Sequence, residues 1–295
     1  MSSVAHHPPQ AERLHPPIPW TGLVWFSGLL ILCYAPVLWR LVQQWETDED
    51  MGHGFFVPVI AAYIAWKKRE HVLRQPVRPA WIGLVVVVYA AAQLTVATLG
   101  AELFLARTAF VLAVIGAVLF AGGWAVARSL AFPLLLLFFM IPIPAILYNQ
   151  ITFPLQLLAS RLAEGALMVM GIPVFREGNI LELADGQRLQ VVEACSGIRS
   201  LLSLSFLALV YGYFFEAKRW VKIVLFAATV PIAIIANAGR VTLTGILSAI
   251  DPQLAQGFFH SASGWVIFMV ALLALVFLHQ AITRFHRYVE AGRDA

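Results

Sequence analysis

Charged residues are scarce in this chain. Lys, Arg, Asp and Glu make up 12% of the 295 residues, about half of the roughly 25% that a soluble globular domain carries. Hydrophobic residues make up 60% of the sequence, and the mean hydropathy is +0.80. This shortage of charge excludes an ordinary soluble domain and predicts an integral membrane protein.

Other absences narrow the class further. Two cysteines cannot form a disulfide framework, and Cys33 lies inside an apolar run, where it serves as a small apolar residue. The eight histidines are scattered without ligand spacing, so we expect no metal site and no cofactor. No basic stripe interleaved with aromatic residues indicates a nucleic-acid partner, and no Gly-x-Ser-x-Gly indicates a serine protease. No internal repeat is visible, so we treat residues 16–295 as one polytopic membrane domain that follows a tail over 1–15.

Apolar runs of the length that a membrane span requires are abundant. A helix needs about 20 apolar residues to cross the hydrocarbon core, and Ile141-Pro-Ile-Pro144 should end the fifth helix because proline breaks the helical hydrogen bonds. We therefore expect an all-α integral membrane protein with about eight transmembrane helices. The expected spans are 16–39, 51–66, 79–101, 108–127, 129–147, 200–215, 223–239 and 261–283.

The distribution of basic residues predicts the orientation. If the N-terminus is cytoplasmic, the inside segments hold 13 of the 20 Lys and Arg residues, as the positive-inside rule requires. This orientation also explains the net charge of +4 and the pI of about 9.3. The tail lacks an apolar signal-peptide core, so we expect the first span to be an uncleaved anchor in a plasma membrane, with both termini cytoplasmic.

The one sizeable outside segment covers residues 148–194. Its first half, 151–175, is apolar but carries Arg161 and Glu164 on one helical face, and a further crossing there would invert all later loops. We predict an interfacial or re-entrant helix. In the second half, apolar and polar residues alternate around Asp185-Gly186, which predicts a short β-hairpin on the outer face.

The hairpin runs into Glu193-Ala-Cys195-Ser-Gly-Ile-Arg199, where polar sequence becomes apolar. The predicted topology brings two more ionisable groups to the same outer boundary, Arg240 at the end of one span and His260 before the last. A thiol attacks as thiolate, which a nearby cation or a helix N-terminus favours. His260 can act as base and later as acid, and Arg240 can stabilise an oxyanion or a substrate carboxylate. Together they predict acyl transfer through a thioester.

Arg199 competes with Arg240 for that role, because it lies one helical turn after Cys195. One of the two arginines is expected to pair with Glu193, and the spacing does not decide which. His53, at the outer end of the second span, is a further candidate for orienting substrate or a catalytic group, although a histidine between two glycines at a helix start is more often a structural contact.

Three blocks in order resemble the exosortase family, bacterial membrane relatives of the archaeosortases. They are Glu193-Ala-Cys195-Ser-Gly-Ile-Arg199-Ser-Leu, Asn237-Ala-Gly-Arg240-Val-Thr-Leu-Thr-Gly, and His260 four residues before Gly264-Trp265. Gly52-His53-Gly54-Phe and the Ile-Pro-Ile-Pro stretch also resemble family patterns, so the resemblance extends over nearly the whole chain.

This resemblance implies a membrane cysteine protease and transpeptidase with Cys195, Arg240 and His260 as its catalytic residues and Arg199, Glu193, Asn237 and His53 in support. The implied partners are exported proteins that end in a Pro-Glu-Pro motif, a transmembrane helix and a basic tail, in bacteria that make extracellular polysaccharide. Cleavage is then expected at the periplasmic face of the inner membrane, with Arg240 or Arg199 recognising the glutamate of the motif. The acceptor, whether water, an amine or a glycolipid, stays open.

Two readings from other classes compete with the peptidase. A transporter would also place ionisable residues in a helix bundle, but it usually has repeated halves and polar helices near the midplane. A non-enzymatic assembly factor for polysaccharide or protein export would need no nucleophile. Replacement of Cys195 distinguishes both alternatives from a peptidase, because only a peptidase would lose substrate processing.

Overall fold

Long apolar helices form most of the chain in the computed structural model, which describes residues 20–291 except 185, 192–197 and 252–257. The predicted tail over 1–15, the turn residue Asp185 and the site candidates Glu193 and Cys195 lie outside the described residues. The helices are α1 (Trp20–Thr47), α2 (Phe56–Lys67), α3 (Arg69–Leu73), α4 (Trp81–Leu99), α5 (Leu103–Ser129), α6 (Ala131–Leu136), α7 (Ala145–Val169), α8 (Ile198–Phe215), α9 (Arg219–Ile250) and α10 (Phe258–Ala291). Two 3₁₀ helices, η1 (Glu49–Phe55) and η2 (Leu137–Met140), precede α2 and follow α6.

Six helices among the described residues are long and apolar enough to cross a membrane: α1, α4, α5, α8, α9 and α10. They correspond to six of the eight predicted spans. The predicted span 51–66 is formed by η1 and the 12-residue α2, and the predicted span 129–147 by α6 and η2. Neither short pair contains a helix that is long enough to be counted as a membrane span. The total of eight spans therefore stays a prediction.

The predicted break at Ile141-Pro-Ile-Pro144 is confirmed. The η2 helix ends at Met140 and α7 begins at Ala145, with a bend of 83° between the two segments. If this bent pair is counted as one span, the described residues contain seven. The bend follows from the two prolines, which cannot donate to the preceding turn.

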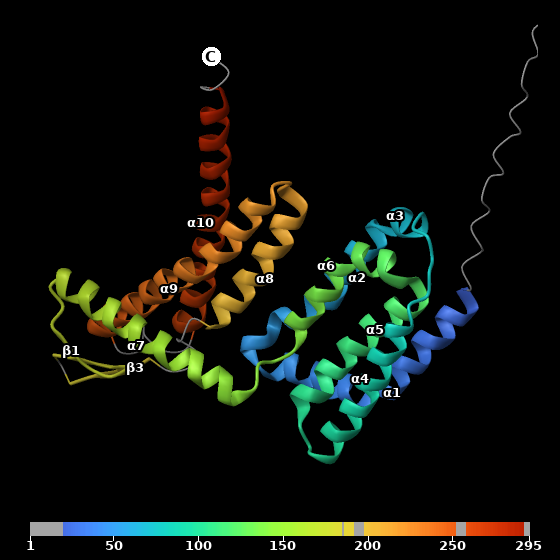
Figure 1. The fold of residues 1–295 in the computed structure, drawn as a ribbon. Helices are drawn as coiled ribbons and strands as arrows, with labels where there is room; N and C mark the ends of the chain where they lie inside the picture. The colour runs from blue at the N-terminus through green and yellow to red at the C-terminus, as the bar shows by residue number, and fades with distance from the viewer. Residues whose placement is uncertain (1–19, 185, 192–197, 252–257, 292–295) are drawn as a thin grey trace, which may run out of the picture.

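The helices form two groups, α1–α6 and α7–α10, and α8 is the helix of the second group that faces the first (Figure 1). In the first group, α4 and α5 approach closely because Gly83 has no side chain; a Cβ there would lie 2.2 Å from the Phe120 backbone nitrogen. Phe206 of α8 joins the core of the first group, where it packs with buried residues of α2, α5 and η2. The buried face of α8 therefore holds the two groups together.

A three-stranded antiparallel sheet follows α7, in the order β1 (Val174–Glu177), β2 (Ile180–Leu183) and β3 (Arg188–Gln190). The predicted hairpin is confirmed as the β2–β3 pair, with Leu181 opposite Leu189. Strand β1 was not predicted, because residues 174 and 175 were assigned to the helix 151–175. That helix instead begins at Ala145 and ends at Val169, since Gly171 adopts φ +78° and a proline follows at 173.

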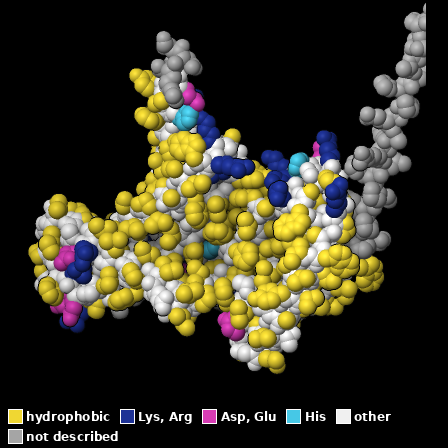
Figure 2. Space-filling view, in the orientation of Figure 1, with side chains coloured by type: hydrophobic (Ala, Val, Ile, Leu, Met, Phe, Trp, Pro, Cys, Tyr) yellow, Lys and Arg dark blue, Asp and Glu magenta, His cyan; other side chains and the backbone are white. Residues whose placement is uncertain are grey.

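Basic connections lie together at one end of the molecule. Figure 2 shows Lys and Arg side chains gathered over the α2–α4 and α8–α9 connections. The Lys68 ammonium donates to the Ser129 carbonyl at 2.9 Å, which joins the ends of α2 and α5. The connections assigned to the cytoplasm thus share one end, and the side of a membrane that this end faces stays a prediction.

Candidate active site

The described chain stops at Val191 and resumes at Ile198, on either side of the predicted nucleophile Cys195. Both flanking side chains are buried. Val191 packs with Val241 of α9 and with Ala159 and Ala163 of α7, while Ile198 begins α8. Val191 is therefore packed against α7 and α9, and its cluster partner Val241 is the residue after Arg240 in the chain.

Arg199, in the first turn of α8, is held by a carboxylate from the other helix group. Its Nε lies 2.7 Å from Oδ1 of Asp50 in η1, and the Tyr148 hydroxyl of α7 donates to the second oxygen, Oδ2. The Asp50 side chain is largely buried, with 16% of its surface exposed. One carboxylate therefore connects η1, α7 and the first turn of α8.

His53 belongs to the same interface. Its Nδ1 lies 3.5 Å from the Ser203 hydroxyl of α8, and its ring is 6.1 Å from that of Phe206. Ser203 is one helical turn after Arg199, so the two residues share a face of α8 that meets Asp50 and His53. The structure thus places His53 beside Arg199 rather than next to Arg240.

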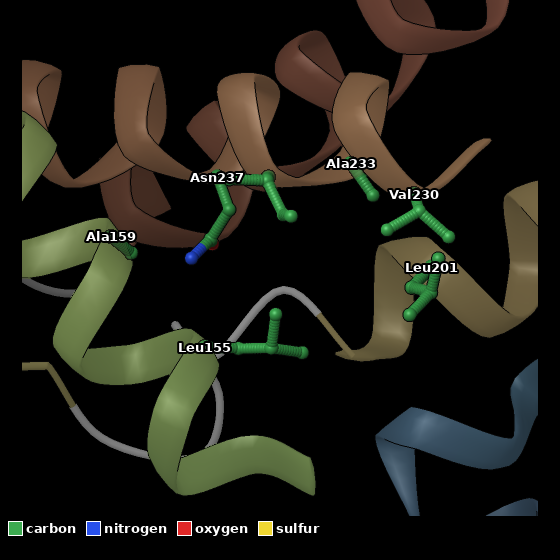
Figure 3. Close-up of a pocket in the computed structure, with 7 residues that line it drawn as sticks. Leu155, Ala159, Leu201, Val230, Ala233 and Asn237 are labelled. Atoms are coloured by element: carbon green, nitrogen blue, oxygen red, sulfur yellow. The ribbon is translucent and has the colours of Figure 1, made fainter. Parts of the chain in front are cut away.

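Asn237 and Arg240 lie one turn apart on α9. The Asn237 side chain is buried and lines a small, partly open hollow between α7, α8 and α9. Figure 3 shows its amide pointing from α9 toward α7. The hollow is otherwise apolar, and its remaining lining residues are Leu155, Ala159, Leu201, Val230, Ala233 and Ile234.

Arg240 packs against the start of α10. A Cβ on Gly264 would lie 3.3 Å from Cζ of Arg240, so the guanidinium rests against a residue that has no side chain. His260 is one turn before Gly264 in α10, which places the two on one helical face. The His260 side chain is outside the described residues, but its helical turn is adjacent to the Arg240 guanidinium.

The sequence candidates therefore fall into two neighbouring sets. Arg199 and His53 lie at the contact between η1 and α8, whereas Asn237, Arg240 and the His260 turn lie between α9 and α10. The sets meet at the hollow, because Leu201 of α8 and Asn237 of α9 both line it. Cys195 precedes Leu201 by six residues in the chain.

Three residues of the site escaped the sequence reasoning. Asp50 was not among the predicted site residues, because its partner Arg199 is 149 positions away. Nothing in the sequence marked Tyr148 or Ser203 as a site residue, since each is an ordinary residue of an apolar helix. Among the residues that the structure describes, no group of three or more His, Cys, Asp or Glu side chains could hold a metal ion.

A comparison with protein families finds one that matches this chain over residues 45–277, described as transmembrane exosortase. No curated protein and no solved structure is significantly similar to the chain. The match covers well over half of the sequence and includes Asp50, the Cys195 segment, Arg240 and His260. The chain therefore belongs to the transmembrane exosortase family.

Proposed function

We propose that this exosortase is a cysteine transpeptidase or protease that cleaves exported proteins at a C-terminal sorting signal. The observation that carries the proposal is the packing of Arg240 against Gly264, one helical turn from His260. This packing brings two of the three proposed catalytic positions into adjacent turns of α9 and α10. Val191, four residues before Cys195 in the chain, belongs to the same buried cluster as Val241, the residue after Arg240.

In the proposed reaction, the Cys195 thiolate attacks the scissile carbonyl carbon after His260 takes the thiol proton. Arg240 stabilises the oxyanion of the tetrahedral intermediate. When the C–N bond breaks, His260 returns the proton to the leaving amine, and the substrate remains as a thioester on Cys195. Attack by water or by an acceptor amine on the thioester then releases the product and restores the thiol.

We infer different roles for the two arginines. Arg199 is paired with Asp50 at 2.7 Å, so its charge is already used in holding η1 to α8. Arg240 lies between the Asn237 hollow and the His260 turn. We therefore assign the oxyanion or the glutamate of a Pro-Glu-Pro motif to Arg240, with Arg199 in a positioning role.

The proposed location is the bacterial inner membrane, with both termini in the cytoplasm and the site facing the periplasm. Support comes from the shared basic end of the α2–α4 and α8–α9 connections, because Lys and Arg are retained on the cytoplasmic side. A substrate whose own helix ends in a basic tail would then present its cleavage motif at the depth of Cys195.

The proposal is tested by Cys195→Ala in cells that express a tagged protein with the sorting signal. We expect processing in the wild type and none in the variant, at equal membrane levels of enzyme. Continued processing by Cys195→Ala would leave a transporter or an assembly factor as the better account. A glutamate-to-glutamine substrate that is processed as well as the original would remove the recognition role from Arg240.

A further inference from the structure

Two lysines from different helix groups meet over one aromatic ring at the basic end of the molecule. The Lys68 ammonium, directly after α2, lies 5.4 Å from the centroid of the Tyr213 ring. The Lys222 ammonium, in the first turn of α9, lies 6.0 Å from the same centroid. We call Lys68 and Lys222 the lysine pair.

The ring leaves the lysine pair only one face. Phe132 of α6 stacks on Tyr213 with a centroid distance of 4.5 Å and an interplanar angle of 7°. With Phe132 on one face of the ring, the two ammonium groups approach Tyr213 from its other side, at 5.4 and 6.0 Å from the centroid. Burial, and secondarily the nearby charge of Lys222, lowers the pKa of Lys68, which is the response expected of like charges held close together.

No carboxylate among the described residues pairs with either member. Lys68 uses one of its three donors on the Ser129 carbonyl. Glu216 pairs with His279, and Glu290 pairs with Lys218 and His286. Within the described part of the chain, Glu70 of α3 is exposed and forms no ion pair with either lysine. Two cations without an acidic partner repel each other, and an anion between them would turn this repulsion into attraction.

The surroundings of the lysine pair match the membrane boundary. Trp66, Phe215 and Trp220, at the same ends of α2, α8 and α9, expose 60%, 69% and 46% of their surfaces. Aromatic side chains at helix ends are typical of the headgroup layer, and basic pockets between transmembrane helices on the cytoplasmic side bind anionic headgroups. The anion that is abundant in this layer is the lipid phosphate.

We propose that the lysine pair binds a phosphate group, supplied by the headgroup of an anionic phospholipid. Each lysine donates to the phosphate oxygens, and the apolar helix ends around the pair contact the acyl chains. The bound phosphate joins α2 of the first helix group to α9 of the second, on the side of the molecule opposite the candidate active site. This inference does not depend on the proposed peptidase activity.

Thermal unfolding of the purified full chain in detergent tests the proposal. Titration with phosphatidylglycerol should raise the melting temperature by about 3 °C or more at saturation, whereas phosphatidylcholine should not. Native mass spectrometry should detect a bound phosphatidylglycerol. In K68Q/K222Q the affinity for this lipid should fall at least about tenfold, and K68R/K222R should retain most of it.

The matched control is R74Q/R219Q, which removes the same charge from the same two connections at exposed positions outside the lysine pair. This control should respond to phosphatidylglycerol as the wild type does. Inorganic phosphate distinguishes the sources: stabilisation by millimolar phosphate without lipid would support a soluble phosphate ligand at the same site. Equal stabilisation of the wild type by phosphatidylglycerol and phosphatidylcholine would overturn the proposal. So would an equal loss of phosphatidylglycerol affinity in K68Q/K222Q and R74Q/R219Q. If K68Q/K222Q does not fold, the comparison of the two lipids on the wild type still tests the proposal.

Discussion

The Asp50 carboxylate has two partners from different helices, Arg199 of α8 and Tyr148 of α7. Ion pairs inside a protein stabilise only when their geometry is good and the remaining lone pairs are satisfied. Asp50 meets both conditions, since each oxygen has a donor. We infer that Asp50 fixes the first turn of α8, which follows Cys195 in the chain.

We predict that Asp50→Asn lowers stability and activity together. Loss of this partly buried pair should cost about 1–2 kcal/mol, or a few degrees in melting temperature, and processing should fall at least about tenfold. Arg199→Gln should give a similar loss of stability and activity. The double variant should be as stable as the less stable of the two single variants, because both substitutions remove the same ion pair. Additive losses would show that the two side chains act independently.

Gly264 gives a second test at the residue scale. An alanine there would place its Cβ 3.3 Å from Cζ of Arg240, which moves the guanidinium without changing its charge. We expect Gly264→Ala to reduce processing about tenfold or more with little change in melting temperature, because small displacements of catalytic groups have large effects on rate. The control is Gly165→Ala in α7, where a Cβ meets nothing within 4 Å; unchanged processing in both variants would contradict the proposed role of Arg240.

At the scale of elements, the α4–α5 hairpin depends on the absence of a side chain at one position. A Cβ on Gly83 would lie 2.2 Å from the Phe120 nitrogen and 2.6 Å from the Gly116 carbonyl, and both atoms belong to backbone that cannot rotate away. Small residues permit this close approach of membrane helices. We predict that Gly83→Ala lowers stability by about 2–3 kcal/mol, measured by thermal unfolding, whereas Gly28→Ala in open space does not. A melting temperature equal to that of the wild type would show that α4 and α5 are further apart.

The α8–α9 connection is fixed to α10 through Glu216, whose carboxylate accepts from the Lys218 N–H at 2.6 Å and lies 3.0 Å from Nε2 of His279. These hydrogen bonds, that of Lys218 first, lower the pKa of Glu216 from its usual 4.5. A carboxyl with a lowered pKa contributes stability above its unfolded pKa and loses it as the pH falls below that value.

We therefore predict that Glu216→Gln melts about 2 °C below the wild type at pH 7, and that the difference shrinks below about pH 4.5 as the wild-type carboxyl becomes protonated. Thermal unfolding at several pH values measures both. A deficit that is the same at pH 4 and pH 7 would mean that the charge of Glu216 does not contribute.

Local sequence rules predicted the elements whose signals are local. The proline break, the β2–β3 hairpin and six long apolar helices follow from short stretches of residues, and all are confirmed. Strand β1 and the true start of α7 were missed, because apolar residues at 145–150 and 174–175 fit more than one element. The contacts of Asp50 with Tyr148 and Arg199 could not be predicted, since they join residues 98 and 149 positions apart.

For the whole molecule, the basic end predicts an orientation in the membrane that can be measured. In a background without Cys33 and Cys195, we expect Ala101→Cys, in the α4–α5 turn, to react with a membrane-impermeant maleimide on intact spheroplasts. Ala217→Cys, in the α8–α9 connection, should react only after the membrane is opened, because Lys218, Arg219 and Lys222 follow it in the connection and the first turn of α9. The reverse labelling pattern would invert the molecule and move the candidate active site to the cytoplasm.

We propose that α8, α9 and α10 together form a site at which the substrate is held as a thioester on Cys195. Mass spectrometry of the new C-terminus of a processed substrate, with and without hydroxylamine, tests it most directly, because hydroxylamine attacks thioesters. The wild type should yield a C-terminal hydroxamate when hydroxylamine is present, and Cys195→Ala should yield no product. A free carboxylate in equal amount with and without hydroxylamine, and no hydroxamate, would contradict the thioester.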